Sequence, residues 1–180
     1  MHVDAIPSDA LTREKVIGIM VQRFGDQFTT AEAIRERHGK GESYHSVASP
    51  DGVFFAKTTE DVAEVVKICA DHKFPIVPFG VGTSLEGNIA ALKGGICVDL
   101  SMMNEILEVN EEDLDVKVQA GVTRKQLNDF LRDTGLFFPI DPGADASIGG
   151  MAATRASGTN AVRYGLSLIH ISEPTRHRYI

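Results

Sequence analysis

The sequence contains no tryptophan, only two cysteines and no long apolar run. Cys69 and Cys97 are too few and too far apart for a zinc site or a redox pair, so we interpret them as buried free thiols in a reducing compartment. No stretch of about 18 apolar residues occurs, which predicts that no segment spans a membrane. The first residues lack a basic segment followed by an apolar core, so no secretory signal is expected. The six histidines show no metal-ligand spacing, and we expect His38 and His45 to be solvated.

Positive charge is also scarce. Lysine and arginine number 18 against 25 acidic residues, which gives a net charge of −7. This balance argues against nucleic acid or an anionic membrane as the main partner. The hydrophobic content of 43% and charged content of 24% are ordinary for a globular protein. At 180 residues, the chain is one large domain or part of a bigger protein, and we expect it in the cytoplasm.

Helical and strand patterns alternate along the first hundred residues. Apolar residues at helical spacing predict a helix over 11–24 that buries Leu11, with Gly25 as its C-terminal cap. A second helix follows a cap at Thr58 or Thr59, and it lies between short apolar strands at 53–56 and 75–78. Strand, helix and strand over so short a stretch predict a βαβ unit with parallel strands. The buried face of the second helix is expected to comprise Val62, Val65, Val66, Cys69 and Ala70.

Further strands are expected at 95–100, 106–109 and 114–119. In the last of these, Leu114, Val116 and Val118 alternate with polar residues, which indicates one buried face. Thr123 begins a capping-box pattern that opens a helix ending at Gly135. The core face of this helix is expected to comprise Leu127, Phe130 and Leu131.

An apolar strand runs directly into residues 80–88, which we call the glycine loop. Glycine allows positive φ and lets the backbone approach a ligand closely, and successive free N–H groups can form a concave anion site. A P-loop is excluded because Asn88, not lysine, follows Gly87. A Rossmann fingerprint is weakened because Leu85 occupies its third glycine position, although Asp99 lies near the distance of its ribose ligand. An ordinary glycine-rich turn is the third alternative.

A second stretch, residues 142–165, is composed mostly of small residues, and we call it the small-residue segment; a valine and the bulky Met151, Arg155, Arg163 and Tyr164 are exceptions. Small residues permit close backbone approach to a flat or phosphorylated ligand. Ser147 is expected to cap a helix that starts at Ile148 or Gly149, and the positive end of that helix would favour an anion. Tight helix packing through small residues is the alternative interpretation.

Together the two stretches resemble a known family. The motifs Pro78-Phe79-Gly80-Val81-Gly82-Thr83-Ser84, Asp141-Pro142-Gly143-Ala144 and Ser157-Gly158-Thr159-Asn160 are similar to the FAD-binding half of vanillyl-alcohol-oxidase (PCMH-type) flavoproteins. Within these, the chain most resembles bacterial D-lactate dehydrogenases of the cytochrome type and glycolate oxidase FAD subunits. The resemblance covers about residues 40–165 and implies an α+β fold of two subdomains with FAD between them. It replaces the Rossmann alternative.

The resemblance implies a set of cofactor-binding residues. The glycine loop would bind the FAD pyrophosphate through N–H and hydroxyl groups, and the small-residue segment would line the pyrophosphate and flavin. Some relatives attach flavin through a histidine in or just before the first loop, and none occurs here, so FAD is expected to be non-covalent. The implied residues are Gly80, Val81, Gly82, Thr83, Ser84, Gly87, Pro142, Gly143, Ala144, Ser147, Gly149, Gly150, Ser157, Gly158 and Tyr164.

The implied organisation is an N-terminal helical extension over 1–46 and a FAD-binding domain over 47–165. The implied function is oxidation of a small D-2-hydroxy acid, D-lactate above glycolate or 2-hydroxyglutarate, with hydride transfer to FAD N5. A cytochrome or quinone would accept the electrons, so the enzyme could be peripheral to the inner membrane. The alternative is a non-catalytic FAD- or nucleotide-binding module that acts with a partner chain.

Residues 166–180 depart from the family pattern. They resemble one reading frame of a transposon adapter used in preparing sequencing libraries, and we interpret them as a non-native tail on a truncated FAD-binding domain; a natural divergent tail is the alternative. The family's bases and substrate ligands lie mostly in the portion that this interpretation makes absent. We therefore name no catalytic or metal-binding residue, and we expect the 180-residue chain alone to be unstable and inactive.

Overall fold

The computed structural model describes residues 10–44 and 46–166. The chain divides into two compact units between Met102 and Met103, and each unit is described by itself. The predictions for His45 and for the tail beyond Leu166 lie outside the described residues. Both units mix helices and strands, which confirms the predicted α+β class.

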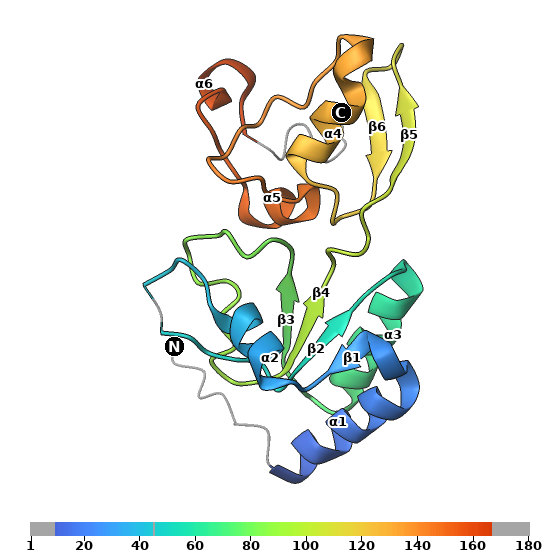
Figure 1. Ribbon diagram of the computed structural model, residues 1–180, viewed down its shortest axis with the longest axis vertical. Coiled ribbons are helices and arrows are strands. Elements are labelled where there is room, and N and C mark those ends of the chain that lie inside the picture. The colour runs from blue at the N-terminus through green and yellow to red at the C-terminus, as the bar shows by residue number, and fades with distance from the viewer. Residues whose placement is uncertain (1–9, 45, 167–180) are drawn as a thin grey trace, which may run out of the picture. The chain divides into compact units, whose positions relative to one another are not determined.

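The first unit is built on a four-stranded sheet with the order β1-β2-β4-β3 (Figure 1). Strand β1 (Phe28–Thr29) runs antiparallel to β2 (Gly52–Phe55). Both β2 and β3 (Ile76–Phe79) run parallel to β4 (Ile96–Asp99), which lies between them. The prediction that β2 and β3 are parallel is therefore correct. Strand β4 lies between these two strands, which were expected to form one βαβ unit.

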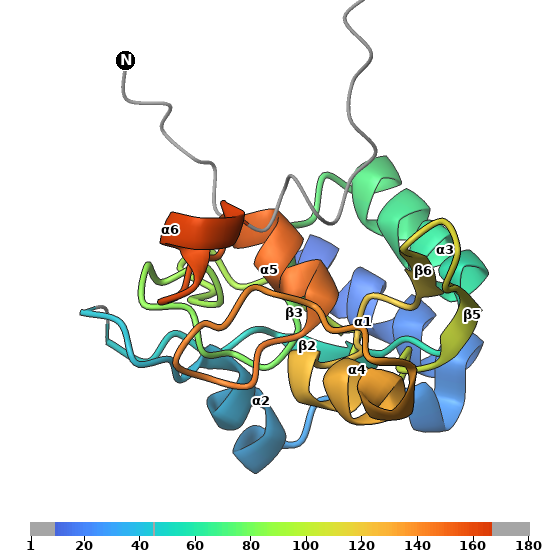
Figure 2. The ribbon, with the colours of Figure 1, turned by 90° about the horizontal axis from the view of Figure 1, so that it is seen from above.

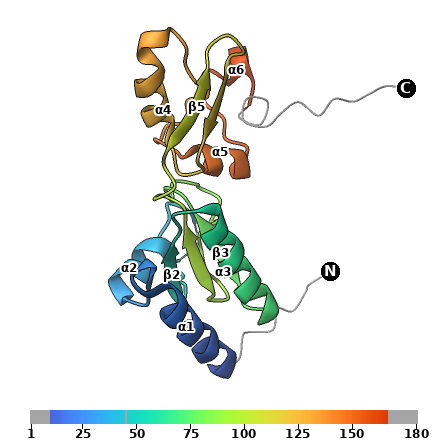
Figure 3. The ribbon, with the colours of Figure 1, turned by 90° about the vertical axis from the view of Figure 1, so that its right-hand side faces the viewer.

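Two long helices, residues 10–24 and 59–71, cover this sheet and contact each other (Figure 3). Helix α1 (Ala10–Phe24) buries Val16 and Met20 completely and is followed by a 3-10 turn, η1 (Gly25–Gln27). The prediction that Leu11 is buried is wrong, because this first-turn side chain is 76% exposed. The apolar stripe therefore covers only the later turns of α1. A shorter helix, α2 (Glu32–Gly39), follows β1.

Helix α3 (Thr59–Asp71) begins at Thr58, whose hydroxyl accepts a hydrogen bond from the Asp61 N–H. The Asp61 carboxylate in turn accepts from the Thr58 N–H, which completes a capping box. Val65 and Cys69 are fully buried, whereas Val66 and Ala70 are exposed. The predicted buried face was too wide, because each residue advances about 100° around a helix and carries Val66 and Ala70 out of the contact.

The second unit contains a hairpin of β5 (Ile106–Asn110) and β6 (Asp115–Val118). Leu114 belongs to the turn, with φ 57° and 73% exposure, so its predicted place on the buried face is wrong. Helix α4 (Arg124–Leu131) begins at Thr123, as predicted, and passes into a 3-10 turn, η2 (Arg132–Thr134). Gly135 ends it with φ 78°. The side chain of Gln126 donates to Asn104 O instead of closing the capping box.

Helices α5 (Ile148–Thr154) and α6 (Ala161–Tyr164) complete the second unit (Figure 2). Phe130 is 60% exposed, so the prediction that it faces the core is wrong. Val116 and Val118 of β6 pack against the core cluster from the side. That cluster comprises Val122, Leu127, Leu131, Ile140, Ile148 and Met151.

Candidate functional site

The glycine loop leaves the carboxyl end of β3, where parallel strands present ligands in α/β sheets. Within the described residues, the N–H groups of residues 81–84 donate to no backbone or side-chain acceptor. Gly82 has φ 75° and Gly87 has φ 77°, so both occupy conformations that favour glycine. A run of exposed, unpaired N–H groups with a left-handed glycine is suited to an anion with several oxygens. The hydroxyls of Thr83 and Ser84 lie in the same run.

The loop rests on apolar side chains beneath it. A Cβ placed on Gly82 would lie 3.0 Å from the Phe79 ring and 3.5 Å from Ile89 Cδ1. Ile89 is 6% exposed, and its Cδ1 also lies 3.4 Å from the Cβ position of Gly41. The loop therefore has a packed underside and an exposed row of donors. No helix follows residues 80–88, which agrees with the rejection of a Rossmann fingerprint.

Asp99 cannot serve as a ribose ligand, because a buried histidine already holds it. His38 Nε2 lies 2.9 Å from Asp99 Oδ2, and the side chains are 6% and 5% exposed. The prediction that His38 is solvated is therefore wrong. No local sequence pattern indicates this pair, because its two members are 61 residues apart.

The small-residue segment lies in the second unit, and Asp141 fastens two parts of it together. Asp141 Oδ2 accepts from the Thr159 hydroxyl at 2.5 Å, and Oδ1 accepts from the Asn160 N–H at 2.9 Å. A Cβ on Gly158 would lie 2.3 Å from Asp141 O, so only glycine fits there. Hydrogen bonds from Thr159 and Asn160 lower the pKa of Asp141. The Asp141 side chain thus holds the segment that contains Ser157 and Gly158 against the start of the Pro142-Gly143-Ala144 stretch.

Glycines of the small-residue segment differ in what surrounds them. A Cβ on Gly149 would meet Ala120 Cβ at 2.8 Å, so packing alone explains that glycine. A Cβ on Gly150 would meet only the Ser147 hydroxyl, at 2.9 Å. Nothing lies within 4 Å of a Cβ on Gly143, and its φ is not positive. The interior of the protein therefore gives no reason for glycine at 143.

Ser147 caps α5, as predicted, and accepts from the Gly150 N–H at 3.3 Å. The next two N–H groups of this helix are also engaged, Ile148 N with Val122 O at 2.8 Å and Gly149 N with Ala120 O at 2.9 Å. Ser147 itself is 3% exposed. The start of α5 consequently offers no spare donor to an anion, which contrasts with the glycine loop.

Tyr164 lies at the end of α6 and is half buried. Its ring meets the Phe137 ring edge-on, with centroids 5.7 Å apart and planes at 81°. The Arg163 guanidinium lies 5.2 Å from the Tyr164 ring centroid. These contacts fix an aromatic surface beside the small-residue segment within the second unit.

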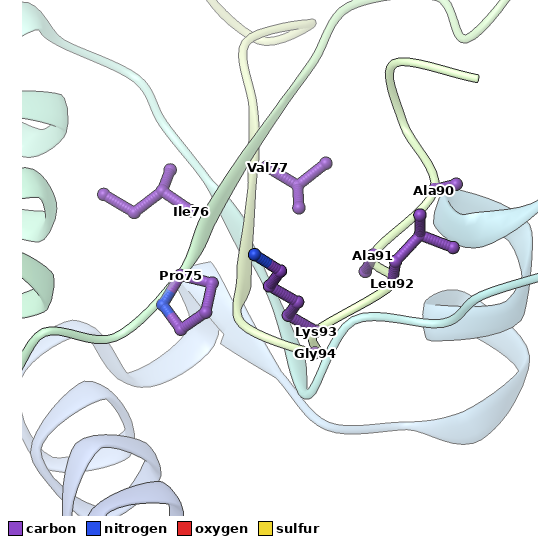
Figure 4. Close-up of a pocket in the computed structure, with 8 residues that line it drawn as sticks. All are labelled: Pro75, Ile76, Val77, Ala90, Ala91, Leu92, Lys93 and Gly94. Atoms are coloured by element: carbon purple, nitrogen blue, oxygen red, sulfur yellow. The ribbon is translucent and has the colours of Figure 1, made fainter. Parts of the chain in front are cut away.

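A hollow of about 250 Å³ lies beside β3 in the first unit (Figure 4). Residues 75–77 and 90–94 line it, and Lys93 supplies its one charged side chain. None of the predicted cofactor-binding residues lines this hollow. The described residues hold no group of three or more histidine, cysteine or acidic side chains placed to bind a metal ion, and none of their helices is long and apolar enough to cross a membrane.

Comparison with known proteins gives one family match that covers both the glycine loop and the small-residue segment. A family model described as a FAD binding domain matches residues 50–173. A protein of Danio rerio named probable mitochondrial D-lactate dehydrogenase is 52% identical over 153 residues, which are 84% of this chain and 31% of that protein. A mitochondrial D-lactate dehydrogenase (cytochrome) of Arabidopsis thaliana is 44% identical over 162 residues, which are 89% of this chain and 28% of that protein. A D-2-hydroxyglutarate dehydrogenase of Stutzerimonas stutzeri is 34% identical over 145 residues, 79% of this chain and 31% of that protein.

Solved structures give the same fold. An alkyldihydroxyacetonephosphate synthase aligns with a TM-score of 0.76 at 23% identity over 92% of this chain and 36% of that chain. A 4-ethylphenol oxidase from Gulosibacter chungangensis aligns with a TM-score of 0.70 at 26% identity over 86% of this chain and 31% of that chain. The chain thus spans about a third of the length of the proteins that it matches.

Proposed function

This chain belongs to the family of FAD-binding domains, and we propose that it forms the cofactor-binding part of a flavin-dependent dehydrogenase that oxidises D-lactate to pyruvate. The observation that carries the proposal is the row of unpaired N–H groups at residues 81–84. The pyrophosphate of FAD carries negative charge and several acceptor oxygens, which such donors bind without any lysine or arginine. Bound flavin would supply the hydride-acceptor chemistry.

The residues of the small-residue segment have properties that suit contact with the cofactor. We propose that Gly143 is glycine because the cofactor, not the protein, occupies the space beside it. Pro142 and Ala144 flank it, and Asp141 holds Ser157 and Gly158 to the same segment. Within the proposal Gly149 keeps α5 close to Ala120, whereas Gly143 serves the ligand directly.

D-lactate is the favoured substrate because relatives named D-lactate dehydrogenase reach 52% and 44% identity, against 34% for a D-2-hydroxyglutarate dehydrogenase. We propose non-covalent FAD, since the glycine loop contains no histidine and both cysteines are fully buried. The proposal includes a cytochrome or quinone as electron acceptor and a place in the cytoplasm or at the periphery of the inner membrane. No catalytic base is assigned to this chain.

Amide hydrogen exchange tests the donor row directly. FAD added to the protein should slow the exchange of the N–H groups of residues 81–84, because these groups have no acceptor among residues 10–44 and 46–166. The N–H groups of Ile148 and Gly149 are already paired and should change little. Unchanged exchange at 81–84 with saturating FAD would contradict the proposal.

A pair of substitutions tests the proposed cofactor contact at Gly143. Gly143→Ala should leave the unfolding midpoint unchanged, because nothing lies within 4 Å of the new Cβ, but should weaken FAD binding at least about tenfold if the cofactor lies there. Gly18→Ala is the matched control: it is an exposed glycine in α1 with equal space, and its replacement should raise stability by about 1 kcal/mol without affecting FAD. Flavin fluorescence titration reports the affinity. Equal affinity of the two variants would argue against a cofactor at Gly143.

The substrate is tested on the protein encoded by the complete reading frame, after the source DNA is resequenced across codons 160–180. Reduction of an artificial electron acceptor would be followed with D-lactate, D-2-hydroxyglutarate and glycolate. The proposal expects the highest kcat/KM with D-lactate. A preference for one of the others would leave the cofactor assignment in place and change the substrate.

A further inference from the structure

A buried histidine lies beneath the glycine loop with both ring nitrogens facing acceptors. His38, in the last turn of α2, places Nδ1 2.8 Å from Ile34 O and Nε2 2.9 Å from Asp99 Oδ2. A carbonyl oxygen and a carboxylate oxygen can only accept, so each nitrogen must carry a proton. This geometry describes an imidazolium, not a neutral imidazole.

The carboxylate partner is held in its charged form. Asp99 ends β4, is 4% exposed, and its Oδ1 accepts from the Ser101 N–H at 2.7 Å. Burial opposes its ionisation, but the hydrogen bonds from His38 and Ser101 outweigh burial and lower the pKa of Asp99. Burial likewise opposes the charged form of His38, but the bonds to Asp99 and to Ile34 O raise the pKa of His38 overall. The two shifts have the directions that an ion pair requires.

The imidazole also touches the strand from which the loop leaves. Its ring centroid lies 4.5 Å from that of Phe79, with planes at 48°, and 5.8 Å from that of Phe55. Phe55, Phe79 and Asp99 are in register at the ends of their strands. A cation near an aromatic ring is attractive, and Phe55 and Phe79 are both half-buried. The Phe79 ring then supports Gly82, whose Cβ position lies 3.0 Å away.

We propose that the His38–Asp99 pair is a buried imidazolium–carboxylate pair that positions the glycine loop for its anionic ligand, through Phe79 and Gly82, without touching that ligand. The positioning role rests on the proposed function, in which residues 81–84 bind FAD. The charge state of the pair does not rest on it. Neither His38 nor Asp99 was among the residues expected to serve the cofactor.

The proposal fixes the direction of a pH dependence. A raised pKa means that the contribution of His38 is fully present below its ordinary value of about 6.5 and is lost as the pH rises through its folded-state pKa. The lowered pKa of Asp99 means that its contribution is lost only in acid, as the pH falls through its folded-state value. Arg37 on α2 opposes the charge of His38, and the neighbouring rings from β2 and β3 carry no charge. FAD affinity should therefore fall as the pH rises through the titration of His38.

The first measurement is the ¹⁵N NMR spectrum of the histidine rings, without and with FAD, in the protein encoded by the complete reading frame. Both nitrogens of His38 should carry protons at pH 6.5, the ordinary pKa of histidine, and the dissociation constant of FAD should rise at least about tenfold across the pH range in which His38 loses its proton. A His38 ring that is already neutral at pH 6.5 would overturn the ion pair. An FAD affinity that is flat across the His38 titration would overturn the positioning role.

Variants separate positioning from simple stability. His38→Gln and Asp99→Asn should weaken FAD at least about tenfold in the fraction that remains folded, and should abolish the pH step. His72→Gln is the matched control, because His72 Nδ1 also lies 2.9 Å from the carbonyl oxygen four residues back, Ile68 O, and has no carboxylate partner in the part of the chain that the structure describes. This control should keep both the affinity and the pH step.

The wild-type data decide the proposal even if the variants do not fold. A protonated His38 pair together with no FAD binding at any pH would remove the proposed function and the positioning role, and would leave the ion pair standing. FAD binding with a neutral His38 would remove the ion pair and would leave the proposed function standing. The two failures are therefore distinguishable in one protein.

Discussion

Asp141 is the single residue on which the shape of the small-residue segment most depends. One carboxylate oxygen accepts from Thr159 and the other from Asn160, so the side chain joins segments 18 and 19 residues apart. Its own backbone oxygen fills the space that a side chain at 158 would need. Because Asp141 lies at the surface, its role can be tested without disturbing the core.

We predict that Asp141→Ala weakens FAD binding about tenfold while the protein stays folded. Without the clamp, the segment would adopt its binding conformation in only about a tenth of molecules, and apparent affinity falls by that fraction. Flavin fluorescence titration gives the affinity and circular dichroism the fold. Asp133→Ala removes a carboxylate that is 93% exposed and should have no effect. If both variants bound FAD alike, Asp141 would have no positioning role.

The two cysteines are confirmed as buried free thiols, and both are fully buried. Burial raises the pKa of Cys69 to about 11, and burial together with the nearby charge of Asp99 raises that of Cys97 to about 12. The reactive thiolate is therefore scarce at neutral pH. We predict that both thiols react with Ellman's reagent far more slowly in the native chain than in denaturant, where two thiols per chain should appear. Rapid reaction of either thiol in the native chain would contradict this burial.

At the scale of single elements, the structure decides which of two threonines caps α3. We predict that Thr58→Ala lowers the free energy of unfolding by about 1 kcal/mol, because the Asp61 N–H loses its acceptor. Thr59→Ala is the matched control, since Thr59 is the first helical residue and makes no capping bond, and it should change stability little. Urea unfolding followed by circular dichroism measures both. Equal losses would mean that the capping box contributes nothing.

Periodicity located most elements because local patterns determine where a helix or strand forms. It did not fix the width of the buried faces, which depends on what packs against them. Val66 and Phe130 are apolar residues at the margin of a helical stripe, and both are exposed. Leu114, which was expected to belong to a strand, lies in the hairpin turn. The caps at Thr123, Gly135 and Ser147 were predictable, since capping depends on residues a few positions apart.

The family resemblance inferred from the two glycine-rich stretches is confirmed by the matching FAD-binding model and the named relatives. The residues that support those stretches could not be predicted in the same way. His38 and Asp99 are 61 residues apart, and Asp141 and Thr159 are 18 apart, with no local pattern that couples them. Motifs marked the two glycine-rich stretches, and only the fold showed which side chains contact them.

The two units differ in how their sheets are completed. Strand β4 has a partner on each side and is buried along its whole length, whereas within the described residues β5 and β6 have only each other. A two-stranded sheet is marginal on its own and depends on the apolar cluster beneath it. We predict that the N–H groups of β4 exchange with solvent at least about tenfold more slowly than the paired N–H groups of β5 and β6, because the hairpin opens without the rest of the chain. Exchange followed by NMR or mass spectrometry without FAD measures this. Equal protection of the two sheets from hydrogen exchange would mean that the chain unfolds in one cooperative step. The expected instability of the 180-residue chain would then not arise from the hairpin.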